Sequence, residues 1–164
     1  MKTILSLSVV VATAFLPAIA VRAANSAKQT VTFSVTAINE LSVSGNPGAM
    51  TVSSGSAGAA PTSVSDQSTR YAITTNASNV KITAAIDSAM PAGVTLEINL
   101  AAPTGAMSAG GVPLGTSAIE VVTGISRLNE SGKGIGYTLS TSANAGVVDA
   151  ESRTVTLTVT AASI

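Results

Sequence analysis

Acid–base chemistry in this chain would have to come from carboxylates alone. The 164 residues include eight Asp and Glu residues but no histidine and no cysteine. A base poised near neutral pH, a thiol nucleophile and a zinc–thiolate site therefore lack their usual side chains. Asp149 and Glu151 are two residues apart, so a strand would place them on one face, as a paired-carboxylate hydrolase requires. The other interpretation is a solvated turn before the last strand. We favour it, and the sequence predicts a protein that is not an enzyme.

Metal and phosphate sites are weakly indicated. The chain has no D-x-[DN]-x-[DN]-G run, which excludes an EF-hand, although a loop calcium site at Asp87 or Asp149 stays open. Residues 132–136 (Gly-Lys-Gly-Ile-Gly) lack the spacing of a phosphate-binding loop, and we expect a hairpin turn there. The sequence therefore predicts no resident metal and no cofactor.

Composition also limits the ligands. The chain has no Trp, and its two tyrosines, Tyr71 and Tyr137, are expected in the core or at an edge and not as a sugar-stacking platform. Charges occur singly, without the basic stripe of a nucleic-acid-binding protein. Lys81 and Glu97 on predicted strands could contribute to a Lys–Asn cross-link of the kind known in some surface pilins. An ordinary cross-strand ion pair is the simpler interpretation.

The first residues have the pattern of an export signal. Lys2 precedes an uncharged apolar run that ends at Ala20 and is followed by small residues. The run is shorter than the ~20 apolar residues that span a bilayer, so cleavage is favoured over a membrane anchor. We expect residues 1–23 to be a signal peptide cleaved after Ala23, with Ala20 as an earlier alternative. Residues 24–164 would then form one secreted or cell-surface domain with a net charge of −2 and no membrane span.

Short alternating or β-branched runs recur between turn clusters such as Gly45–Gly48. The mature chain has no sustained 3.6-residue apolar period, so we predict an all-β fold, an immunoglobulin-like antiparallel β-sandwich of about seven to nine strands. Residues 53–65 and 102–117 are expected to be loops, and Phe33 would be the largest core side chain. The predicted strands are Thr30–Ile38, Leu41–Ser44, Ala49–Val52, Arg70–Thr75, Val80–Ile86, Val94–Ala101, Ala118–Ile125, Gly136–Ser142 and Thr154–Ala161.

Two stretches near opposite ends of the chain are almost the same. Residues 30–37 read TVTFSVTA and residues 154–161 read TVTLTVTA, so apolar side chains alternate with hydroxyls in both. Neither contains the lysine or proline with which soluble proteins often protect sheet edges. Such a segment can add to a sheet edge of another copy, with its apolar side chains entering alternate pockets. The assembly residues predicted in this way are Val31, Phe33, Val35, Val155, Leu157 and Val159.

A simpler explanation of the likeness is that both stretches fill similar inward positions, or that they pair within one molecule. T-V-T repeats are common in strands, and such patterns specify register weakly. If residues 30–37 instead act as a donor strand, signal cleavage would free them for assembly. Residues 24–29 would then form the connecting arm.

The export signal, the absence of cysteine and the alternating strand after the cleavage site resemble secreted fibre or pilus subunits that assemble by donor-strand complementation. The chain is most similar in style to cysteine-free subunits of biofilm-matrix fibres and archaeal bundling pili; chaperone–usher pilins differ by a cysteine pair and a C-terminal aromatic residue. The resemblance implies a self-polymerising subunit of an extracellular filament, pilus-like fibre or surface layer. Its expected partner is another copy of itself, and other surface proteins are a second kind of partner that the resemblance implies. The alternative is a monomeric, adhesin-like exported module that binds carbohydrate or protein.

Overall fold

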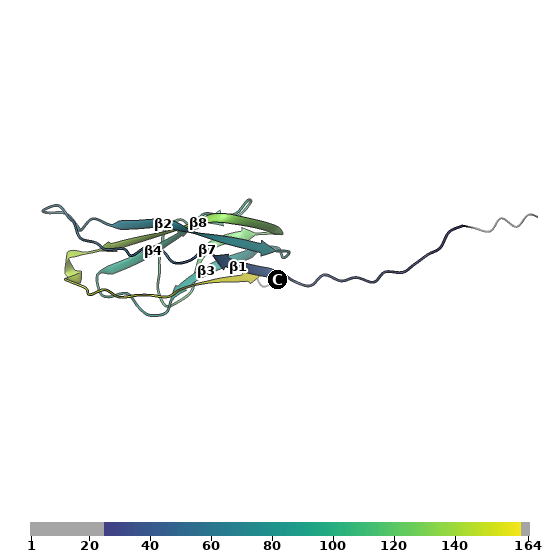
Figure 1. The fold of residues 1–164 in the computed structure, drawn as a ribbon. Helices are drawn as coiled ribbons and strands as arrows, with labels where there is room; N and C mark the ends of the chain where they lie inside the picture. The colour runs from purple at the N-terminus through teal and green to yellow at the C-terminus, as the bar shows by residue number, and fades with distance from the viewer. Residues whose placement is uncertain (1–24, 162–164) are drawn as a thin grey trace, which may run out of the picture. The chain divides into compact units, whose positions relative to one another are not determined.

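The computed structural model describes residues 25–161. The chain divides after Ser34: residues 25–34 have no regular secondary structure, and the folded unit begins at Val35. This folded unit is all-β, with two antiparallel sheets face to face in a β-sandwich-like arrangement (Figure 1). Its one helix among the described residues is the short 3-10 helix η1 (Ala143–Ala145).

The two sheets divide the strands by alternation along the chain. The larger sheet has the order β1-β2-β8-β4-β6 and the smaller sheet the order β5-β7-β3-β9. From β2 onward, each connection therefore carries the chain from one sheet to the other. The strands are β1 (Asn39–Val43), β2 (Val64–Thr75), β3 (Val80–Ile86), β4 (Val94–Leu100), β5 (Met107–Ser108), β6 (Val112–Pro113), β7 (Ile119–Ile125), β8 (Leu128–Thr141) and β9 (Val155–Ala161).

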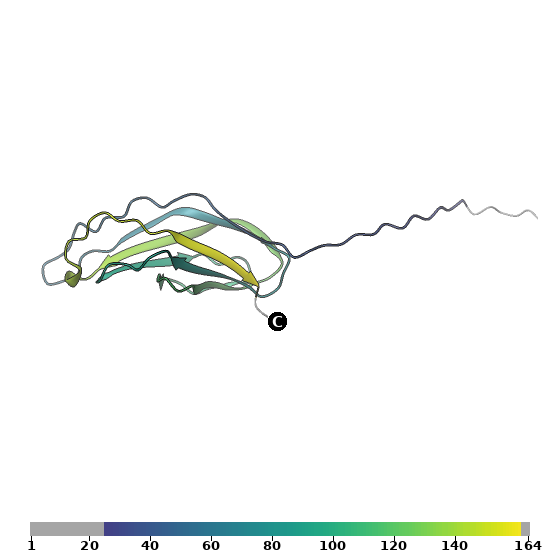
Figure 2. The ribbon, with the colours of Figure 1, turned by 90° about the horizontal axis from the view of Figure 1, so that it is seen from below.

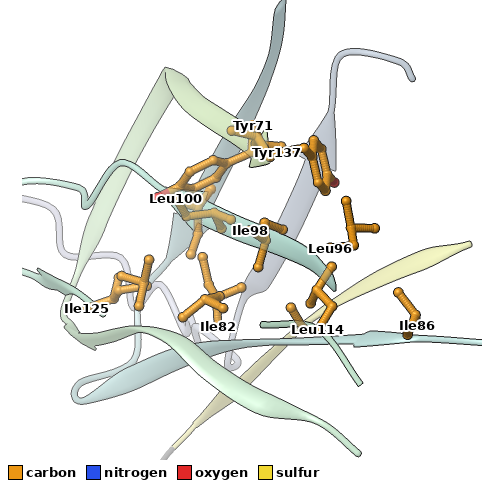
Figure 3. Close-up of a cluster of buried hydrophobic side chains, with 14 of the residues drawn as sticks. Tyr71, Ile82, Ile86, Leu96, Ile98, Leu100, Leu114, Ile125 and Tyr137 are labelled. Carbon is orange, nitrogen blue, oxygen red and sulfur yellow. The ribbon is translucent and has the colours of Figure 1, made fainter. Parts of the chain in front are cut away.

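The core lies between the two sheets and follows from the period-two pattern of the strands. Along β3, buried residues alternate with half-buried ones from Val80 to Ile86, because successive side chains point to opposite faces. Figure 3 shows Ile82 and Ile125 of the smaller sheet facing Ile98 and Leu100 of the larger sheet. All four of these side chains are completely buried.

The largest core side chains are Tyr71 and Tyr137, whereas Phe33, which we expected in this role, is 87% exposed. Tyr71 lies on β2, and its hydroxyl donates a hydrogen bond to the carbonyl oxygen of Ala101 at 2.6 Å. Burial, helped by the negative charge of Glu130, raises the pKa of Tyr71 to about 12. Burial also raises the pKa of Tyr137.

Most of the predicted strands coincide with observed ones, and the prediction for Val80–Ile86 matches β3 at both ends. Residues 30–38 and 49–52 are not strands, so these two predictions were wrong. Neither segment has a partner strand among the described residues. Just before the second segment, the N–H of Gly48 donates to the Asp66 carboxylate and not to a neighbouring strand. β5 and β6 lie within residues 102–117, which we had expected to be a loop.

Residues 132–136 do not form the predicted hairpin turn but lie within β8. The β2–β8 register shifts there, since Tyr71 is opposite Lys133 while Ile73 is opposite Glu130. β8 therefore contains one extra residue at this point, and Gly132 has a φ of 70°. A glycine with positive φ absorbs the extra residue of a β-bulge, so the glycines continue the strand and do not end it.

The raised pKa of Tyr71 predicts a loss of stability at alkaline pH. The folded state favours the neutral phenol, so stability is constant below the ordinary tyrosine pKa of ~10 and falls as pH rises toward about 12. Tyr71→Phe should reduce this fall and cost about 1 kcal/mol at neutral pH through the lost hydrogen bond to Ala101. Urea unfolding at several pH values measures both effects. A Tyr71→Phe protein with the same alkaline fall as the wild type would contradict the assignment.

Candidate assembly cleft

β9 lies at the edge of the smaller sheet and pairs with β3 alone among the described strands. The N–H of Asp87 donates to the carbonyl oxygen of Thr154 at 3.1 Å, which fixes the phase of the ladder. In an antiparallel pair the peptide groups of successive residues point alternately toward the partner and away from it. The N–H and C=O groups of Val155, Leu157 and Val159 therefore point to the open edge. They form a template to which another strand can bind.

The inward side chains of β9 are only half-buried, unlike those of β3 beside them. The β3 residues that pair with them are at most 3% exposed. Paired residues point to the same face of a sheet. The difference in burial therefore arises from what covers these side chains from the opposite sheet, and not from the direction in which they point. The pairs are Val155–Ile86, Leu157–Ala84 and Val159–Ile82.

β1, at the edge of the larger sheet, has the same incomplete cover. Val43 pairs with Tyr71, which is 1% exposed, yet Val43 itself is 53% exposed. Leu41, the preceding residue on that face, is half-buried. β1 also contacts β9, which is the yellow strand at the front of the view in Figure 2. The apolar faces of these two edge strands are thus left partly open on the same side.

A cleft of about 1060 Å³ occupies this side of the folded unit. One wall is β1 with the residues that follow it up to Val52, and the other is β9 with the residues that precede it from Val148. The floor comes from the inward faces of β4 and β8. Its residues are mainly apolar: Val94, Leu96, Ile135, Tyr137, Leu139 and Thr141.

Thr69 is a buried polar residue that lines this cleft, and its hydroxyl has no hydrogen-bond partner in the described part of the chain. The side chain is 4% exposed and lies on β2, directly after a register shift that begins at Asp66. The Asp66 carboxylate accepts hydrogen bonds from the hydroxyl and N–H of Ser68 and from the N–H of Gly48, which together lower its pKa. An unpartnered buried hydroxyl costs about 1–3 kcal/mol, so the cleft holds an unsatisfied hydrogen-bonding group.

Charged residues gather at the end of the cleft where β9 begins. Arg153 donates to the carbonyl oxygen of Ala89 from Nε at 3.2 Å and from Nη2 at 2.9 Å. Its Nη2 also donates to a carboxylate oxygen of Glu151 at 2.6 Å. Asp149 and Glu151 lie in the exposed coil before β9, as the solvated-turn interpretation expects, and Glu151 is held by Arg153. These contacts attach the β3–β4 connection to the start of β9.

Lys81 forms an ion pair with Glu120 of the neighbouring strand β7, at 2.6 Å. Glu97, the partner that the sequence suggested, lies on β4 in the other sheet, so that pairing was wrong. The Asp87 carboxylate accepts hydrogen bonds from Thr154 and Ser88, which lower its pKa. Across residues 25–161, no three Asp or Glu side chains come together in a group that could hold a metal ion.

The six predicted assembly residues fall into two groups. Those of β9 have half-buried inward side chains: Val155, Leu157 and Val159. Val155 and Leu157 line the cleft, whereas Val159 is not among its lining residues. The others lie in no strand and are highly exposed: Val31 (71%), Phe33 (87%) and Val35 (79%). Ala23, the predicted cleavage position, lies outside the described residues. No sequence pattern pointed to Thr69, because its inward direction depends on the register shift before it.

Comparison of the chain with protein-family models, with curated proteins and with solved structures found no match in any of the three. Within residues 25–161, no helix has the length and apolar character needed to cross a membrane. The candidate site is therefore defined by its geometry: an open apolar cleft, an unpaired strand edge and one unpartnered hydroxyl.

The open cleft predicts unequal costs for two truncations in paired strands. Ile82→Ala, in the closed core, should lower the free energy of unfolding by about 2–5 kcal/mol. Leu157→Ala, on the half-covered wall, should lower it by only about 1 kcal/mol, because much of that side chain already contacts solvent. Chemical unfolding in dilute solution measures both values. Equal costs would mean that the cleft is closed in the isolated chain.

Proposed function

We propose that the chain is an exported, non-enzymatic structural subunit that polymerises by strand addition. Residues 30–37 of one copy would enter the cleft between β1 and β9 of the next copy. One observation carries the proposal: an apolar cleft with an unpaired strand edge occurs in the same chain as an exposed alternating segment. The finer description of the fold follows from it, namely an immunoglobulin-like sandwich that is completed by a strand from a neighbour.

The incoming segment matches the open edge of β9 in length and the cleft in its apolar pattern. Eight extended residues span about 26 Å, and the seven residues of β9 span about 23 Å. An alternating strand bound to β9 would direct Val31, Phe33 and Val35 into the cleft and leave their hydroxyl neighbours in solvent. Burying each of these exposed apolar side chains contributes roughly 1.5–3 kcal/mol, and the main-chain hydrogen bonds to β9 add to it.

The segment is poorly suited to filling the cleft of its own chain as a hairpin with β1. The Asn76 side chain accepts from the N–H of Ile38 and donates to the carbonyl oxygen of Thr36, so the residues just before β1 are held in place. A tight hairpin there would need positive φ values, which favour Gly, Asn or Asp. Thr36 and Ile38 are β-branched, and no glycine lies between Thr36 and Asn39. These features favour a cleft in a second copy.

Chain direction favours an open fibre. β1 begins at the end of the sheets where β9 finishes, since Asn39 pairs with Thr75, Ala161 pairs with Val80, and one short turn joins Thr75 to Val80. A donor that enters from the opposite end, near η1, would run antiparallel to β9. Each copy would then receive a strand at one end and donate from the other. Such a head-to-tail contact generates a filament when its rotation does not close.

The alternative function is a monomeric exported binding module that uses the same cleft for a ligand. The cleft volume of about 1060 Å³ is near the upper limit of small-molecule sites, which span about 300–1,000 Å³. The floor, however, offers few polar groups that could orient a small ligand. A strand, which brings its own main-chain hydrogen bonds, fits this apolar surface better. Export through residues 1–23 is part of both proposals.

A charge on the inward face of the donor segment should abolish assembly. Phe33→Asp would force a carboxylate into the apolar cleft, so fibres should disappear while the chain stays folded. Ser34→Asp, which adds the same group on the opposite face, is the matched control and should still form fibres. Negative-stain microscopy and sedimentation measure both. Fibres from Phe33→Asp, or equal loss in both variants, would count against the proposed cleft.

Two variants that cannot polymerise alone, one with a disabled donor segment and one with a disabled cleft, should bind each other through a single contact when they are mixed. The Phe33→Asp chain keeps an intact cleft, and a Leu157→Asp chain keeps an intact donor segment but carries a charge in the cleft wall. Neither should polymerise alone, whereas an equimolar mixture should form a one-to-one complex in sedimentation velocity. Val43→Asp, at a more exposed position of the opposite wall, replaces Leu157→Asp if that variant does not fold. A mixture that stays monomeric would contradict strand exchange.

A further inference from the structure

We infer that the Thr69 hydroxyl forms a hydrogen bond with the Gln29 side chain of the incoming strand and thereby sets its register in the cleft. The inference rests on the proposed strand addition and specifies where along the cleft the strand stops. The alternating pattern of the donor segment does not by itself determine one register. A segment that repeats Val and Thr every second residue can shift by two positions and still present an apolar face.

Thr69 marks one position along an otherwise mainly apolar surface. It lies on the cleft beside Ile135, its partner in the β2–β8 register, and its hydroxyl is buried without a partner. Beyond Ile135, the next inward residues of β8 along the cleft are Tyr137 and Leu139. An incoming strand with apolar side chains alone would leave the Thr69 hydroxyl unsatisfied.

Gln29 is placed on the matching face by the alternation of the donor segment. In an extended strand it lies on the same side as Val31, Phe33 and Val35. It is also the polar residue on that face nearest to the apolar run; the next one, Asn25, is four positions earlier. Its amide offers both a donor and an acceptor, so it can pair with a hydroxyl in either sense.

One register pairs the Thr69 hydroxyl with the Gln29 amide. In a strand antiparallel to β9, Gln29 at the level of Thr69 puts Val31 near Tyr137 and Phe33 near Leu139, because the donor and β8 have the same two-residue spacing. A shift by two residues moves the Gln29 amide over apolar side chains and leaves Thr69 unpaired. Unpaired buried polar groups are costly, so the shifted strand binds less tightly.

A double-mutant cycle on the one-to-one complex of blocked full-length mature chains tests this contact. Thr69→Val is added to the Phe33→Asp chain, and Gln29→Met to the Leu157→Asp chain, and the Kd of each of the four combinations is measured. Each single change should weaken binding by about tenfold. The double variant should bind about as well as either single variant, because both polar groups are then removed together.

The outcomes separate this contact from the proposed function. If the two changes act independently and together weaken binding about a hundredfold, strand addition stands but the Thr69–Gln29 contact is wrong. If no complex forms from the parent chains, both proposals fail. Thr30→Val, on the opposite face of the donor, is the matched control and should show no coupling to Thr69→Val. The unbound Thr69→Val chain should unfold at the same temperature as its parent or a higher one, which rules out a merely structural loss.

Discussion

The open edge of β9 and the uncovered core beside it leave the folded unit with one incomplete side. A strand at a sheet edge has unpaired peptide groups on one side, and here its inward side chains also lack cover. The two deficits coincide in direction, since the peptide groups and the inward side chains of Val155 and Leu157 border the same cleft. One added strand with a two-residue period would remove both deficits together.

The four sheet edges are protected very unequally. β5 and β6 are two-residue strands, and β6 contains Pro113. β1 has five residues and carries Glu40. β9 has seven residues with no charge and no proline, and like β1 it borders the cleft. Length and protection would therefore direct the proposed strand addition to β9 and not to the other three edges.

The folded unit can keep this cleft open because its other half is closed. Ile82, Ile98 and Ile125 are completely buried between the sheets, and the Tyr71 hydroxyl is satisfied by Ala101. Outside the core, an ion pair joins Lys81 to Glu120 on the neighbouring strand. Arg153 joins the start of β9 to the β3–β4 connection through its hydrogen bonds to Ala89. Stability of the isolated chain thus comes mainly from one side of the sandwich. The other side is available for a partner.

The sequence pattern predicted which face of a strand is buried better than it predicted which strands pair. Val80–Ile86 was predicted correctly because both neighbours of β3 are present in the same chain and bury its inward face. Residues 30–37 have nearly the pattern of β9 yet form no strand, since a strand also needs a partner edge, and periodicity carries no information about that edge. The glycines of 132–136 were mistaken for a turn because a bulge and a turn both use positive φ. Thr69 could not be found from sequence, as the shift after Asp66 determines which face it joins.

Edge pairing alone would not select one partner, because any extended chain can bind unpaired peptide groups. Two β9 edges could pair with each other and satisfy those groups, but they would leave both clefts empty. The donor segment differs in supplying a bulky residue, Phe33, at the centre of its apolar face, with valines two positions to either side. In the proposed assembly, selectivity would therefore reside in the cleft, and the cleft and the β9 edge would share the affinity. The inferred polar contact at one end of the segment would add a single register, which neither the cleft nor the edge provides.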